Sequence, residues 1–108
     1  MIGHYILEGR EPKPVTMLQW AAWFGRRQYN RQRIVAQTQI APGLTVSTVF
    51  LGLDHNFSGK GPPLLFETMV FNDYGAGDCW RWATWGAAEA GHLDVVDQME
   101  AKLKDRAT

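Results

Sequence analysis

The triplet Asp54-His55-Asn56 is the polar group of this sequence best placed to do chemistry. It follows an apolar, strand-like run, and a scaffold holds side chains in fixed positions at the end of a strand. Together with Glu67, an adjacent aspartate and histidine are residue types that can move protons. A metal site would need a further ligand such as Glu67 or His92, and no ligand pair has the helical i, i+4 spacing. We therefore expect no metal, no cofactor and no catalytic site.

A structural role for the same triplet is the competing interpretation. Asp and Asn side chains often bond to nearby backbone and so shape loops, in which case His55 is a surface residue. The loop continues through Gly59-Lys-Gly-Pro-Pro63, where a phosphate-binding loop would instead open a helix after Gly-x-x-x-x-Gly-Lys-Ser/Thr. The remaining alternative is a loop that contacts a partner through Asp54, His55, Asn56 and Lys60.

Four arginines within eight residues form the other candidate binding feature: Arg26, Arg27, Arg31 and Arg33. Guanidinium groups can grip phosphates while Tyr29 stacks on a base. The sequence pI of about 6.8 argues against a dedicated nucleic-acid binder, because such proteins are usually basic as a whole. The competing interpretation is a solvated helix end whose cations complement the helix dipole.

The net charge of zero hides two oppositely charged halves. Between Pro12 and Leu53 the chain has five basic residues and no acidic one, whereas from Asp54 onward it has nine acids and five bases. Such complementary halves favour a homodimer, or docking on an acidic host or phage protein.

A chain of 108 residues predicts one domain, residues 1–108. No apolar run approaches the roughly 18 residues of a membrane span, and the N-terminus lacks the pattern of a signal peptide. We therefore expect a cytoplasmic protein with no membrane partner. Cys79 is the single cysteine, which rules out an internal disulfide, and beside Trp80 we expect it to be packed rather than nucleophilic.

Hydrophobic periodicity predicts the elements that position these groups. Residues 4–7 indicate a short strand, and residues 8–14 a turn closed by two prolines. Thr16 and Gln19 form a capping box that starts a helix, which should run on into the arginines. The apolar stripe of this helix is Met17, Trp20, Ala21 and Phe24, with Leu18 and Trp23 beside it.

From Arg33 onward the apolar period changes from 3.6 to 2, which predicts a β-hairpin. A loop at residues 41–43 places Ile40 opposite Leu44 and Ile34 opposite Phe50. One face of the hairpin then carries Ile34, Ala36, Thr38, Ile40, Leu44, Val46, Thr48 and Phe50.

The second half of the chain adds two strands and a helix. Residues 64–71 have a mixed character on both faces, which indicates a central strand, and residues 72–78 form a turn before a last strand at 79–83. Thr84 caps a C-terminal helix in which His92 lies on the apolar stripe as a satisfied core residue. The fold class is α+β: an antiparallel sheet of three to five strands with one early inserted helix and one C-terminal helix. The helix stripe is Ala88, His92, Val95, Met99 and Leu103.

Three stretches carry a likeness to known sequences: Ser47-Thr-Val-Phe-Leu-Gly-Leu-Asp-His-Asn-Phe57, Gly61-Pro-Pro-Leu-Leu-Phe-Glu-Thr-Met-Val-Phe71, and Thr84-Trp with Ala88-Glu-Ala-Gly-His92. On these residues the chain resembles a group of small uncharacterised proteins encoded by bacteriophages and prophages. The resemblance implies a phage or prophage origin and brings no assigned activity.

We therefore expect a small non-enzymatic interaction protein that binds a host or phage macromolecule and regulates or inhibits it, for example in a host defence complex. The alternative is a nucleic-acid-binding module that uses the Arg26–Arg33 cluster. Binding of that kind would weaken steeply with salt.

Overall fold

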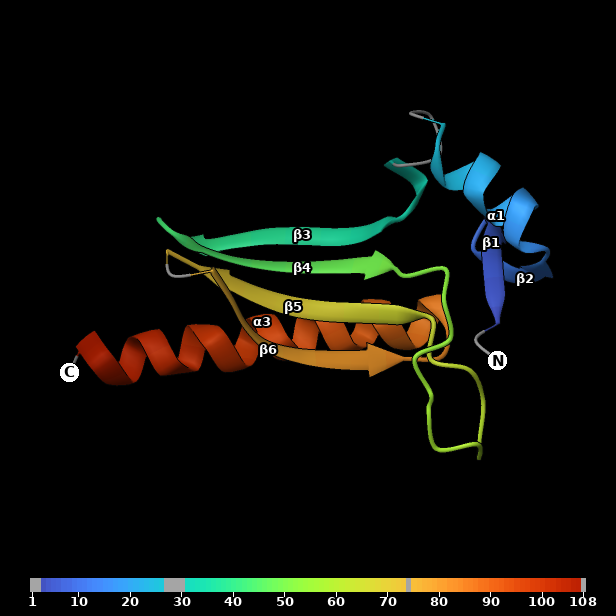
Figure 1. Ribbon diagram of the computed structural model, residues 1–108. Coiled ribbons are helices and arrows are strands. Elements are labelled where there is room, and N and C mark those ends of the chain that lie inside the picture. The colour runs from blue at the N-terminus through green and yellow to red at the C-terminus, as the bar shows by residue number, and fades with distance from the viewer. Residues whose placement is uncertain (1–2, 27–30, 74, 108) are drawn as a thin grey trace.

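The computed structural model describes residues 3–26, 31–73 and 75–107, and in these ranges an antiparallel four-stranded sheet is covered on one face by a long C-terminal helix (Figure 1). A two-stranded ribbon and a shorter helix lie at one end of the sheet. The predicted α+β class, with an early and a C-terminal helix, is confirmed. The elements are β1 (His4–Glu8), β2 (Glu11–Val15), α1 (Met17–Phe24), β3 (Ile34–Ala41), β4 (Leu44–Phe50), β5 (Phe66–Asn72), β6 (Gly75–Trp82) and α3 (Trp85–Ala107).

The N-terminal ribbon differs from the prediction. The expected turn over residues 8–14 is wrong, because the chain turns at residues 9–10 and both prolines lie within β2, with Pro14 opposite Tyr5. The Tyr5 N–H points away from β2 and donates to the Gly52 carbonyl at 2.8 Å. The facing proline therefore sits at a position where no ladder hydrogen bond is required of it, the position that strands tolerate.

Helix α1 starts as predicted and ends earlier. Thr16 and Gln19 form the reciprocal capping box, with the Thr16 hydroxyl accepting from the Gln19 N–H at 3.2 Å. The helix ends at Phe24, and the Gly25 N–H bonds back to the Ala21 carbonyl. The expected extension into the arginines is therefore wrong, and no basic residue lies in the last turn to complement the helix dipole.

The hairpin of β3 and β4 has the predicted register at its centre and not at its ends. Thr38 lies opposite Val46, in line with the predicted pairing, and Val46 is fully buried. A register shift between Ile34 and Ala36 places Ile34 opposite Val49 instead of Phe50, and leaves Ile34 40% exposed. An extra residue in a strand reverses the faces of the side chains that precede it.

Strands β5 and β6 complete the sheet in the order β3-β4-β5-β6, so the prediction of a central strand is confirmed for β5. The expected turn over residues 72–78 is wrong, because β6 begins at Gly75 and pairs with β5 from there. The packed position expected for Cys79 is also wrong: the thiol is exposed. Trp80 and Trp82 pack toward α3, so the alternation of a strand turns Cys79 to the other face.

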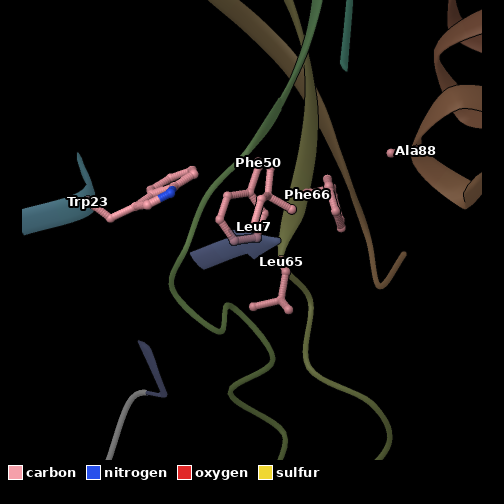
Figure 2. Close-up of a cluster of buried hydrophobic side chains, with 6 residues drawn as sticks. All are labelled: Leu7, Trp23, Phe50, Leu65, Phe66 and Ala88. Atoms are coloured by element: carbon pink, nitrogen blue, oxygen red, sulfur yellow. The ribbon is translucent and has the colours of Figure 1, made fainter. Parts of the chain in front are cut away.

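Two apolar clusters hold these layers together. The first joins the ribbon, α1, the sheet and the start of α3 at one end of the molecule (Figure 2): Leu7, Trp23, Phe50, Leu65, Phe66 and Ala88. The second lies between the sheet and the middle of α3: Val46, Val70, Val95, Val96 and Met99. No helix in the described ranges is long and apolar enough to cross a membrane.

Candidate functional site

The connection between β4 and β5 is a loop built on the side chain of Asp54. Its carboxylate oxygen Oδ1 accepts from the backbone N–H of Asn56 at 2.8 Å and from that of Leu64 at 3.0 Å. The first bond turns the chain at the start of the loop, and the second ties the start of the loop to its end. Asp54 therefore has the structural role proposed for it, since both contacts are with its own loop.

Asn56 organises the far part of the same loop. Its Nδ2 amide donates to the carbonyls of Lys60 and Pro62, at 2.7 and 2.8 Å, and its Oδ1 accepts from the backbone N–H of Ser58. Donors and acceptor of the side chain are all in use. The loop is thus held by two side chains that satisfy its backbone, in place of a regular ladder.

Two rings lie next to each other on this loop: His55 is half-buried and Phe57 is exposed. The Nδ1–H of His55 donates to the Leu53 carbonyl at 2.8 Å, because a carbonyl can only accept, and its ring centroid lies 5.8 Å from that of Phe57. The Phe57 side chain is 72% exposed, and Lys60 is also exposed. The loop therefore presents an aromatic ring and a cation to solvent.

Removal of the Asp54 carboxylate tests this description of the loop. We expect Asp54→Ala to lower the free energy of unfolding by about 1–3 kcal/mol, because two backbone N–H groups lose their acceptor. Lys60→Ala, which removes an exposed side chain, is the matched control and should change stability by less than about 0.5 kcal/mol. Urea unfolding measures both, and equal midpoints for the two variants would contradict the role of Asp54.

The structure describes three of the four arginines, and their surroundings differ. The Arg33 guanidinium lies 4.7 Å from the ring centroid of Phe24, and its Nε–H donates to the Phe50 carbonyl at 3.3 Å. Burial lowers the pKa of Arg33 from its ordinary value. Arg26 and Arg31 are exposed, whereas Arg27 falls outside the described residues, as does Tyr29. Arg33 is therefore packed against the core, whereas Arg26 and Arg31 are the arginines of this group that are exposed among the described residues.

The structure brings Arg33 and the loop to the same end of the sheet. Arg33 precedes β3 and Asp54 follows β4, and these strands are antiparallel neighbours. The Phe50 N–H donates to the Arg33 carbonyl at 2.7 Å, and the Asp54 N–H to the Gly3 carbonyl at 3.1 Å. The ribbon of β1 and β2, α1, Arg33 and the loop of residues 51–65 thus form one end of the molecule, which we call the loop end (Figure 1).

Two residues of α1 add exposed apolar surface to the loop end. Met17 is 64% and Leu18 is 82% exposed, so the expectation of Met17 on the buried stripe is wrong. The helix instead buries Trp23, with Trp20 and Phe24 half-buried beside it. The sequence held a signal for this exposure: Gln19 is the single polar residue in α1, and so short a helix cannot bury every side.

The residues named for a catalytic or metal site lie in different surroundings among the described parts of the chain. Glu67 makes an ion pair with Arg81 at 3.0 Å on the face of the sheet opposite α3, and Asp54 is bonded to its own loop. In the ranges 3–26, 31–73 and 75–107, no three His, Cys, Asp or Glu side chains gather as metal ligands would. His92 is buried away from this end and belongs to the core.

Comparisons with known proteins add no relative. No family model matches the chain, and neither a curated protein nor a solved structure matches it.

Proposed function

We propose that this chain is a non-enzymatic interaction protein of phage or prophage origin that docks on a host or phage protein through its loop end and thereby regulates or inhibits it. The observation that carries the proposal is the exposure of three large apolar side chains there, Met17, Leu18 and Phe57, at 64%, 82% and 72%. Met17 and Leu18 are neighbours on α1, and the loop that carries Phe57 extends from the other side of the same end (Figure 1). Large exposed apolar groups, and Phe, Met and Arg in particular, are typical of protein-binding surfaces.

The charges of the loop end indicate what kind of surface it fits. Three exposed cations belong to the segments of the loop end: Arg26 follows α1, Arg31 precedes β3, and Lys60 lies on the loop. Apolar anchors in pockets supply most of the binding energy of an interface, while charges at its rim set the partner and the association rate. The fitting partner is a protein with an apolar pocket bordered by carboxylates.

Charged substitutions at the apolar anchors test the proposal. Tagged wild type, Leu18→Glu and Phe57→Glu are used to capture proteins from a nuclease-treated bacterial lysate, and the captured protein is then purified and titrated. We expect Leu18→Glu or Phe57→Glu to weaken its binding at least about tenfold, because a buried carboxylate loses hydration. Ala101→Glu, at an exposed position of α3, is the control and should bind as the wild type does.

Equal affinity in the two anchor variants and the control would overturn the proposal. Both anchor positions are exposed, so the variants should keep the fold, which near-ultraviolet circular dichroism checks.

Nucleic-acid binding is the second candidate, and the exposed Arg31 is the observation in its favour. The packing of Arg33 against Phe24 leaves fewer cations for phosphates than the sequence suggests. If this candidate is right, a fluorescent oligonucleotide binds with an affinity that falls steeply with salt concentration. Arg31→Ala should then reduce the slope of log affinity against log salt concentration by about one unit, because one phosphate contact is lost. The anchor variants Leu18→Glu and Phe57→Glu then leave that slope unchanged.

A further inference from the structure

Strand β3 forms an unusually unprotected edge of the sheet. It lies at one end of the order β3-β4-β5-β6, and among the described residues no strand pairs with its outer side. Its eight residues, Ile34–Ala41, include no charge and no proline. Edge strands normally carry such features because unpaired N–H and C=O groups recruit other strands. The opposite edge, β6, does carry charges, at Asp78 and Arg81.

The sequence of β3 is close to a palindrome centred on Thr38. Gln37 and Gln39 flank this residue, and Ala36 and Ile40 lie outside them. When two copies of such a strand pair antiparallel about a two-fold axis at Thr38, Gln37 faces Gln39 of the second copy and Ala36 faces its Ile40. Each glutamine therefore faces a glutamine, and each small Ala36 faces a larger Ile40. A symmetric interface requires such self-complementary contacts.

We propose that β3 pairs with β3 of a second copy of this chain, so that the dimer contains one continuous eight-stranded antiparallel sheet. The proposed pairing is centred on the regular middle of β3. The register shifts of this strand lie near its ends, between Ile34 and Ala36 and between Gln39 and Ala41. This inference does not depend on the proposed function.

The side chains on both faces of β3 suit such a contact. Gln37 and Gln39 are exposed on the open face. Gln37 Nε2 donates one of its protons to the Ser47 hydroxyl at 3.2 Å, so its second N–H and its Oε1 are the groups that can bond to Gln39 of the other copy. On the face toward α3, Ala36 and Ile40 are half-buried, and the second copy would cover their remaining apolar surface.

Helix α3 adds an apolar group near the same edge. Gly91 lies against Trp82 of β6, and the next residue, His92, is bonded to Thr38 of β3. Successive residues of α3 therefore point further toward the β3 side of the sheet. Leu93 follows in the same rotation and is 65% exposed. The two α3 helices lie on one face of the joined sheet in this dimer, with Leu93 on the side of each helix that is nearer the partner.

Paired charge substitutions at positions 37 and 39 test both the dimer and its register. Gln37→Lys with Gln39→Lys puts lysine opposite lysine twice, and we expect dimerisation to weaken at least about tenfold. Gln37→Glu with Gln39→Lys puts glutamate opposite lysine, and we expect the dimer to persist. Ala101→Lys on α3 is the control for added charge. Sedimentation equilibrium over a concentration series measures all four proteins, and the wild type should reach twice its 12.2 kDa chain mass.

A wild type that stays monomeric at several hundred micromolar overturns the proposal. Equal dissociation of the two double variants overturns it as well, because the pairing of position 37 with position 39 would then be wrong. A second measurement avoids dependence on variant stability: Gln37→Cys with Gln39→Cys, in a Cys79→Ser background, should form interchain disulfides on mild oxidation. Leu18→Glu should dimerise normally, which separates failure of this inference from failure of the proposed function.

Discussion

Replacement of His92 with alanine is expected to lower the free energy of unfolding by about 3–5 kcal/mol, through the loss of packing together with buried hydrogen bonds. His92 is 2% exposed and lies on α3 against the sheet. Its Nδ1 lies 2.7 Å from the Thr48 hydroxyl, and its Nε2 lies 2.9 Å from the Thr38 hydroxyl. Both ring nitrogens are therefore satisfied by the sheet.

The bonds of His92 belong to a chain that crosses all four strands. Trp82 Nε1–H donates to the Thr68 hydroxyl at 2.9 Å, and that hydroxyl lies 2.6 Å from the one of Thr48. The protons of Trp82, Thr68, Thr48 and His92 all find an acceptor within the chain when Thr68 donates to Thr48, Thr48 donates to Nδ1 of His92, and the Nε2–H donates to Thr38; the hydroxyl proton of the half-buried Thr38 then lies outside the chain. This direction requires a neutral imidazole with its proton on Nε2.

Acid should weaken the protein through the same residue. Burial lowers the pKa of His92 from its ordinary value near 6.5. Between the folded and unfolded pKa values the unfolded state binds more protons, so stability rises with pH in that window. The contribution is complete above about pH 6.5 and is lost as the pH falls toward the folded pKa. A protonated ring would also need to donate from Nδ1, which reverses the chain of hydroxyls.

Urea unfolding at several pH values between 5 and 7.5 measures both effects. The stability difference between wild type and His92→Ala should be largest at the upper end and should shrink toward pH 5. Thr38→Val, which removes one half-exposed partner, should cost only about 1 kcal/mol and keep the pH dependence. A difference that is constant with pH would show that His92 does not titrate differently on folding.

The sequence predicts the faces on which this network lies, and does not predict its bonds. Alternation places Thr48 and Thr68 inward, and the helical period places His92 on the stripe of α3; the structure confirms all three positions. The bonds depend on how far α3 is shifted along the sheet and on the register of β4 and β5. Neither quantity is encoded in the period of a single element.

The early end of α1 and the position of Arg33 share a physical cause, which is that tertiary contacts outweigh a local pattern. Gly25 ends α1 before the arginines, because Trp23 and Phe24 have already packed on Phe50. The same packing draws Arg33 onto Phe24, a contact that residue types and spacing cannot reveal. The loop was the predictable part of the candidate site, because Asx side chains act on their own neighbours.

The loop end as a whole was not predictable, because the sequence does not say where the N-terminal ribbon docks. The bridge of His4 with Leu53 brings α1 to the loop, although the two are far apart in the chain. Exposure of Met17 and Leu18 follows from that docking, since α1 turns its tryptophan side to the core. Candidate binding residues on separate segments become one region only through this contact.

Replacement of Gly91 with alanine should destabilise the protein by about 1–3 kcal/mol, although alanine is normally the better helix former by about 1 kcal/mol. A Cβ at this position would lie 2.3 Å from an atom of the Trp82 ring, so the helix and the ring cannot both stay in place. The ring is not free to turn aside, because its Nε1–H is bonded to Thr68.

Gly86 provides the matched control, since it lies in the same helix and a Cβ there would meet nothing within 4 Å. Gly86→Ala should therefore stabilise the protein by about 0.5 kcal/mol, the opposite sign to Gly91→Ala. A second test removes the Trp82 ring. In a Trp82→Ala background the close approach disappears, and Gly91→Ala should become stabilising. Thermal unfolding of the four single and double variants measures these signs. A loss at Gly91 that persists without the Trp82 ring would place its origin in the helix backbone instead of in the contact between α3 and β6.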